Sequence, residues 1–128
     1  MVCASSVSQL AALEALKNRQ SNRYASRMVD AWSVRRKIVI EQVERTGGLI
    51  KMLPPEGAFY DWLDVSATGM NGKDFSAALL SEKKVGVLPG YLFGESGKSF
   101  IRISFATSLE MFDRIRWILV ADIASKSL

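Results

Sequence analysis

Apolar residues alternate with other residues in the run 99–105, which predicts a β-strand whose two faces differ. One face carries Ile101, Ile103 and Phe105, and the other carries Phe100, Arg102 and Ser104. We expect the first face to pack on the core, so Arg102 projects from the opposite face of a rigid sheet. A guanidinium held there suits the binding of a planar anion such as a carboxylate. An ion pair with a neighbouring acid, or simple exposure to water, is the alternative.

Two stretches near the N-terminus have the composition and spacing of helices. Residues 6–18 are rich in Ala and Leu, which favour helix. After a polar break at residues 18–22, a second helix is expected to extend to about Arg45, because its apolar residues recur every three or four positions. Thr46-Gly47-Gly48 predicts its end, since glycine accepts the left-handed backbone that follows a last helical turn.

The remaining elements are predicted to be short. Strands are expected at residues 49–52, 58–63 and 85–88, and Asn71-Gly72 opens a helix with Phe75 and Leu79 turned inward. Thr107 and Glu110 form a capping box for a last helix. The buried side of that helix would carry Leu109, Phe112, Ile115 and Leu119. This mixture predicts an α+β fold with long N-terminal helices, in which helices cover one face of a small, mainly antiparallel sheet.

Composition narrows the classes of function. The chain has 128 residues, a length typical of one domain, and a net charge of +4 without a basic stripe or reading motif, so no nucleic-acid partner is expected. The single cysteine, Cys3, excludes an internal disulfide and favours the cytoplasm. Histidine is absent, which excludes histidine-based catalysis and histidine metal sites. No apolar run approaches the ~20 residues of a membrane span, and no signal peptide is expected.

Residues 94–99, Gly-Glu-Ser-Gly-Lys-Ser, copy the end of a phosphate-binding P-loop. The complete motif needs a glycine where Leu92 stands, and it needs a helix after the lysine to hold the phosphates. A strand is predicted there instead. We therefore interpret the segment as a loop that leads into the Arg102 strand.

Four short motifs follow one another along the chain at residues 54–60, 85–90, 93–94 and 101–106. In this order they resemble the C-terminal part of the fold type I, pyridoxal-phosphate-dependent aminotransferases of class I/II, the aspartate-aminotransferase-like class. The patterns of that family there are roughly P-x-G-A-F-Y, V-x-V-x-P-G-x-x-F-G and R-(I/L)-S-(F/Y)-A. Residues 9–16 and 24–36 are similar to the helices that lead into the small domain of the family. The resemblance extends from about Ser6 to Val120.

The resemblance implies an enzyme that transfers an amino group between an amino acid and a 2-oxo acid, with pyridoxal 5'-phosphate as cofactor. It assigns Arg102 to the arginine that binds the substrate α-carboxylate. Phe59 and Tyr60 could line the active-site cleft that Arg102 would face in this family. Both are interpreted more simply as core residues. A lyase or synthase of the same fold, or a standalone interaction or regulatory module, is the alternative function.

The family's cofactor-binding lysine lies in an S-K-x-x-x-x-x-G-x-R-like segment, and no lysine of this chain has that context. The lysines are Lys17, Lys37, Lys51, Lys73, Lys83, Lys84, Lys98 and Lys126. The family's acid for the pyridine nitrogen and most of its phosphate-binding groups are missing too. By this resemblance, residues 1–22 are a helix that would connect to an absent large catalytic domain, and residues 23–128 are the small C-terminal domain.

The chain alone is therefore expected to be inactive and not to bind pyridoxal phosphate. No catalytic, cofactor-binding or metal-binding residue is assigned to it, and Arg102 is the one substrate-binding candidate. The expected partners are the protein's own large domain and a second copy of the chain. Self-association through apolar residues of the first helix is expected, because the large domain would normally cover them. These residues are Val7, Leu10, Leu13 and Leu16.

Overall fold

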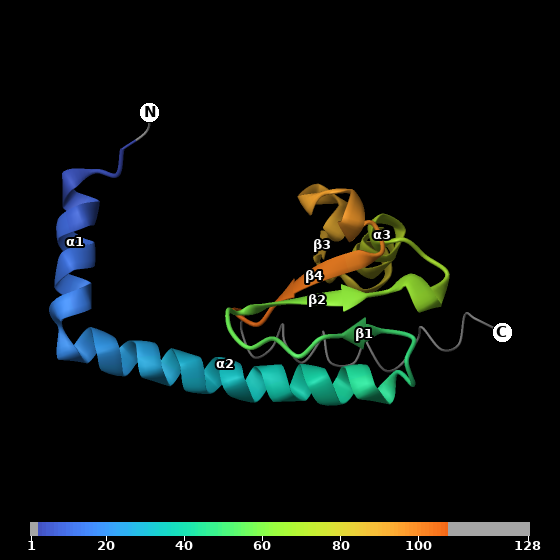
Figure 1. Ribbon diagram of the computed structural model, residues 1–128, viewed down its shortest axis with the longest axis horizontal. Helices are drawn as coiled ribbons and strands as arrows, with labels where there is room; N and C mark the ends of the chain where they lie inside the picture. The colour runs from blue at the N-terminus through green and yellow to red at the C-terminus, as the bar shows by residue number, and fades with distance from the viewer. Residues whose placement is uncertain (1–2, 108–128) are drawn as a thin grey trace. The chain divides into compact units, whose positions relative to one another are not determined.

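The computed structural model describes residues 3–107, so the predicted last helix and its capping box lie outside the described residues. Two compact units make up the chain, residues 1–34 and residues 35–128. Figure 1 shows their helices and strands. Among the described residues, no helix combines the length and the apolar character needed to cross a membrane.

The first unit contains α1 (Ser6–Lys17) and the beginning of α2 (Arg19–Arg45). The Ser5 hydroxyl caps α1 by accepting a 3.1 Å hydrogen bond from the Ser8 N–H. Asn18 is the single residue between the two helices, and its backbone is extended, with φ −83° and ψ 125°. Its side chain accepts a 2.8 Å hydrogen bond from the Gln20 N–H. The predicted polar break is thus a single extended residue that also caps the next helix.

The second unit contains a four-stranded antiparallel sheet in the order β1-β2-β4-β3. Its strands are β1 (Lys51–Met52), β2 (Tyr60–Asp64), β3 (Leu88–Pro89) and β4 (Phe100–Ser104). Helix α3 (Gly72–Lys83) follows β2, and the part of the unit that the structure describes also contains three 3-10 turns: η1 (Ser66–Thr68), η2 (Gly90–Phe93) and η3 (Glu95–Gly97). The α+β class and the antiparallel sheet are confirmed.

Three predicted strands have different bounds, each for a local reason. β2 begins at Tyr60 because Ala58 has a left-handed φ of 63°, which is incompatible with a strand. β1 begins at Lys51 because the Ile50 N–H bonds the Thr46 hydroxyl instead of a neighbouring strand. β3 begins at Leu88 because Val85 closes the end of α3 with a hydrogen bond to the Leu79 carbonyl.

The core lies on one face of the sheet. Leu63 and Ile101 are fully buried there, together with Ile103 and Phe105. From the helices, the buried apolar residues are Val39 and Val43 of α2 and Phe75 and Leu79 of α3. In Figure 1 the C-terminal half of α2 runs alongside β1 and β2.

Two arginines of α2 tie this half of the helix to the sheet and to the loop before β2. Arg35 donates hydrogen bonds of 2.9 and 2.7 Å to the carbonyls of Phe105 and Thr107, and Arg36 donates one of 2.8 Å to the carbonyl of Pro55. Because Ile101 and Ile103 of β4 are buried in the core, Arg102 between them lies on the opposite face of the sheet.

Candidate functional site

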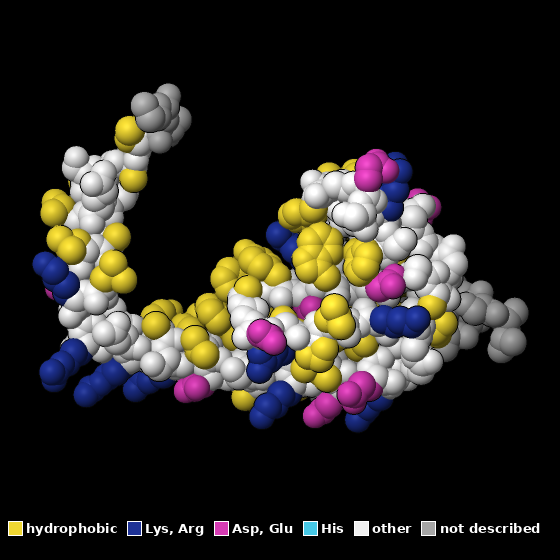
Figure 2. All heavy atoms as spheres, viewed as in Figure 1, with side chains coloured by type: hydrophobic (Ala, Val, Ile, Leu, Met, Phe, Trp, Pro, Cys, Tyr) yellow, Lys and Arg dark blue, Asp and Glu magenta, His cyan; other side chains and the backbone are white. Residues whose placement is uncertain are grey.

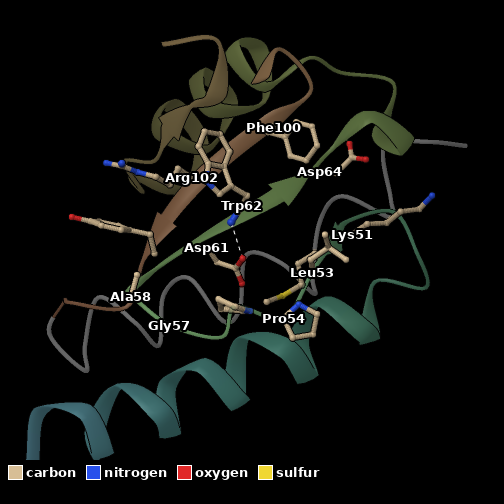
Figure 3. Close-up of a pocket in the computed structure, with 13 residues that line it drawn as sticks. Lys51, Leu53, Pro54, Gly57, Ala58, Asp61, Trp62, Asp64, Phe100 and Arg102 are labelled. Carbon is tan, nitrogen blue, oxygen red and sulfur yellow. Dashed lines mark hydrogen bonds between the residues drawn. The ribbon is translucent and has the colours of Figure 1, made fainter. Parts of the chain in front are cut away.

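Arg102 lies in the middle of β4, where its Cα is paired with Trp62 of β2 on one side and with Leu88 of β3 on the other. The predicted alternation is confirmed: Ile101 and Ile103 are buried, whereas Arg102 is partly exposed. Figure 3 shows Arg102, Trp62 and Phe100 on the same side of the sheet. The backbone of a central strand thus fixes the position from which the guanidinium extends.

Two aromatic rings cover the guanidinium of Arg102. Its Cζ atom lies 4.4 Å from the centroid of the Tyr60 ring and 4.6 Å from the centroid of the Phe93 ring. Both distances are within the range of cation–π attraction. The interpretation of Tyr60 as a core residue is wrong, because it is 37% exposed and lies beside Arg102.

Within the described residues, the Arg102 guanidinium forms no hydrogen bond and no ion pair, and it lies over two aromatic rings. In this part of the chain, Arg102 therefore does not form the ion pair with a neighbouring acid that was the alternative interpretation. The N–H groups of a guanidinium lie in its plane, so they remain available to an acceptor that approaches from the edge. This is the geometry in which arginine binds a carboxylate with two parallel hydrogen bonds.

Arg102 also lines a pocket of about 710 Å³ at the open edge of β2. β1 pairs only with Leu63 and Asp64, so no strand among the described residues pairs with this edge of β2 beside Tyr60–Trp62. Its lining comes from residues 51–55 and 57–58, from residues 60–62 and 64 of β2, and from Phe100 and Arg102 of β4. Lys51 is the one lysine among these residues, and its side chain points away from Arg102 (Figure 3).

Asp61 is a buried acid to which the sequence analysis assigned no role. It is 4% exposed and projects from the side of the sheet opposite Arg102 (Figure 3). One carboxylate oxygen, Oδ1, accepts a 2.7 Å hydrogen bond from the Trp62 N–H. The other, Oδ2, is buried and has no hydrogen-bond partner among residues 3–107. Burial raises the pKa of this carboxyl from its ordinary value of 3.8 to about 6. A charged residue at an apolar position of an alternating strand was the signal for it.

Asp61→Asn is expected to stabilise the chain at pH 7.5 and to have little effect near pH 3.5. The raised pKa means that the folded chain favours the protonated acid, so stability falls as pH rises from about 4 to about 6 and stays lower above that. Asparagine is neutral throughout, so at pH 7.5 the gain should be about 1–3 kcal/mol. Urea unfolding of both proteins at the two pH values measures it. An equal change in unfolding free energy at both pH values would contradict the assignment.

Comparison with known proteins identifies relatives across most of the chain. The family model for class I and II aminotransferases matches residues 1–116. The aspartate aminotransferase of Pyrococcus horikoshii is 41% identical over 102 residues, which are 80% of this chain and 26% of that protein. The chain spans about a quarter of the length of the curated relatives it matches.

Solved structures of relatives have the same fold. An aromatic aminotransferase from Pyrococcus horikoshii has a TM-score of 0.79 at 34% identity, covering 88% of this chain and 30% of that chain. The aspartate aminotransferase of Thermotoga maritima has a TM-score of 0.70 at 37% identity, covering 91% of this chain and 29% of that chain. The arrangement of helices and sheet described above is thus that of one part of these larger proteins.

Proposed function

Since the chain belongs to the class I and II aminotransferases, we propose that its residues 23–128 are the small C-terminal domain of a pyridoxal-phosphate-dependent aminotransferase. Residues 1–22 would connect this domain to the large catalytic domain. Together the two domains transfer an amino group between an amino acid and a 2-oxo acid, and this chain binds the α-carboxylate that all such substrates share.

The observation that carries the proposal is the environment of Arg102. Its guanidinium lines a pocket, has no acid or carbonyl partner in the described part of the chain, and is covered by two rings. A structural arginine such as Arg35 differs, because its Nη1 atom donates to two backbone carbonyls. An arginine with unused donors in a pocket is arranged for a ligand, and its planar fork matches a carboxylate.

Pyridoxal phosphate needs an amine for its aldehyde, donors for its phosphate and an acid for its ring nitrogen. The pocket's one lysine, Lys51, points away from Arg102, and the buried acid Asp61 lies on the other side of the sheet (Figure 3). The residues that line this pocket therefore do not bring such an amine and acid together beside Arg102, and the proposal assigns cofactor binding to the large domain. The cofactor, when bound there, stores the electrons of the reacting bond.

The contribution of this chain is orientation. Two parallel hydrogen bonds from Arg102 fix the plane of the substrate carboxylate, and they thereby fix the direction of the bonds at the neighbouring α-carbon. Holding a reacting bond in its productive direction is a recognised source of rate acceleration. The same carboxylate binding serves a lyase or synthase of this fold, which analysis of the reaction products of the joined enzyme distinguishes from a transaminase.

The test uses the 128-residue chain and NMR detection of the Arg102 side-chain Nε–Hε signal. Alanine and pyruvate are expected to shift this signal saturably, with a Kd of about 1 mM or weaker, the range of a single charged contact. The amide alaninamide lacks the carboxylate and should leave the signal unchanged. Equal responses to alanine and alaninamide, or no response to any carboxylate, would refute the proposal.

An interaction module is the second candidate, and exposed apolar residues on α1 favour it. Val7, Leu10 and Leu16 are 77%, 66% and 78% exposed, and no residue of α1 is buried. Figure 2 shows hydrophobic side chains at the surface of this helix. A helix of this kind marks an interface with another domain or another copy of the chain.

We expect the isolated chain to self-associate through α1. Leu10→Glu with Leu16→Glu should shift the population toward monomer, because the two charges would have to be desolvated in the interface. Light scattering over a range of concentrations measures the average mass. Lys17→Glu, which changes the charge of α1 without removing an apolar residue, serves as the control. A chain that stays monomeric at high concentration would refute self-association.

A further inference from the structure

The position of Phe93 follows from close backbone contacts between glycines. Phe93 ends η2, which begins at Gly90, and Gly90 packs directly against Gly97 at the end of η3. A Cβ atom added to Gly90 would lie 2.3 Å from the Gly97 carbonyl oxygen, and one added to Gly97 would lie 2.2 Å from that of Gly90. Only glycine allows the two segments to approach this closely. A Cβ atom on Gly90 would also lie 2.8 Å from the carbonyl oxygen of Phe100 in β4, so glycine at this position lets η2, which carries Phe93, lie close to β4.

Trp62 supports the Phe93 ring from a second direction. The two rings meet edge to face, with centroids 5.1 Å apart and an interplanar angle of 80°. This is one of the preferred arrangements of aromatic pairs. Trp62 also contacts Phe100 of β4, with centroids 6.2 Å apart. Phe93 is thus fixed both by the backbone that carries it and by a neighbouring ring on the sheet.

Tyr60 and Phe93 contact Arg102 from separate sides. Each ring centroid lies within 4.6 Å of the Arg102 Cζ atom, yet no ring contact joins Tyr60 and Phe93 themselves within the described residues. Tyr60 comes from the neighbouring strand β2, and Phe93 comes from a segment more than thirty positions later. Two supports of independent origin therefore limit the rotation of one guanidinium.

From these contacts we infer that Phe93 and Tyr60 are positioning residues, which hold the plane of the Arg102 guanidinium before a ligand binds. As a consequence, the site prefers a planar carboxylate to a tetrahedral anion. This inference rests on the proposed function, because it concerns the same arginine. A guanidinium already held in its binding orientation loses less conformational freedom on binding. A guanidinium held in one plane presents two parallel N–H groups, which match the two coplanar oxygens of a carboxylate.

The experiment uses the 128-residue chain and two anions of equal charge, acetate and methanesulfonate, which carry the same methyl group. Ring currents should move the side-chain proton signals of Arg102 upfield in the unmodified chain. Titration of these signals gives a Kd for each anion, and acetate should bind more tightly. The ratio of the two constants reports the preference for a planar ligand.

Phe93→Leu is expected to remove part of the upfield shift and to reduce the preference for acetate about twofold to fivefold, the factor that one exposed cation–π contact supplies. Tyr60→Phe should retain both the shift and the preference, because the ring remains, whereas Tyr60→Leu should lose them in part. Leu92→Ala, an exposed neighbour on η2, is the control and should change neither. Backbone amide spectra verify that each variant is folded.

The outcomes separate the two proposals. If Arg102 binds acetate but its protons show no upfield shift, or if Phe93→Leu leaves the ratio of the two constants unchanged, the positioning role is wrong and the proposed function stands. If the upfield shift is present but neither anion perturbs Arg102, the proposed function fails, and the positioning role fails with it.

Discussion

Arg102→Lys, made in the enzyme joined to its catalytic domain, is expected to lower kcat/KM about tenfold to a hundredfold for every amino acid and 2-oxo acid tested. Lysine keeps the positive charge but loses the planar fork, so it cannot form two parallel hydrogen bonds to a carboxylate. A hydrogen bond to a charged group is worth about 1.5–3 kcal/mol, which corresponds to that loss in rate. The effect should be similar for all substrates, because they share the α-carboxylate.

The same variant should bind pyridoxal phosphate as the unmodified enzyme does, since the proposal places the cofactor in the other domain. Arg45→Lys, at the exposed end of α2, is the matched control and should have normal kinetics. Steady-state kinetics, cofactor absorbance and the melting temperature are measured on each protein. Normal kinetics with a lowered melting temperature for Arg102→Lys would identify it as a structural residue and defeat the proposed role.

Gly72→Ala is expected to destabilise the chain by about 3 kcal/mol, near the upper end of the usual cost of overpacking. Gly72 is the first residue of α3, and its N–H donates a 2.7 Å hydrogen bond to the Lys98 carbonyl. A Cβ atom there would lie 2.0 Å from the carbonyl oxygen of Phe100. Backbone atoms cannot rotate away as side chains do, so α3 and β4 must move apart to make room for the methyl group. This cost outweighs the higher helix propensity of alanine relative to glycine.

Gly86→Ala is the matched control, because a Cβ atom at Gly86 meets no atom within 4 Å and its φ is not left-handed. Thermal unfolding should show a melting temperature roughly 10 °C lower for Gly72→Ala and nearly unchanged for Gly86→Ala. Similar melting temperatures for the two variants would show that α3 and β4 tolerate the methyl group. Carboxylate titration of Gly72→Ala below its melting temperature would reveal whether displacement of Phe100 also reaches Arg102.

The sequence predicted the location of Arg102 correctly because strand alternation is a local property with a period of two. The ends of both long helices were predictable for a similar reason, since Gly47 and the polar residues near Asn18 are local signals. The same reasoning assigned Tyr60 to the core. Its actual contact depends on an arginine in a neighbouring strand, and no short-range pattern contains that information.

The environment of the site was the less predictable part. Phe93 lies beside Arg102 at the end of a turn whose first residue, Gly90, packs against Gly97, and these contacts are properties of the folded chain. The burial of Asp61, and the lack of a partner for its Oδ2 atom in the described part of the chain, depend on what packs against the strand. Sequence patterns thus placed Arg102 on its strand, whereas the rings beside its guanidinium come from tertiary contacts.

The two outer strands of the sheet limit the ways in which copies of this chain can aggregate. β1 and β3 contain two residues each, and one residue of β3 is Pro89, which has no N–H to donate. Short edges that carry proline are poor templates for the edge-to-edge strand pairing that leads to fibrils. When the chain is overproduced, it should therefore form oligomers through α1 that dissociate on dilution. Fluorescent dyes specific for cross-β fibrils should not stain them.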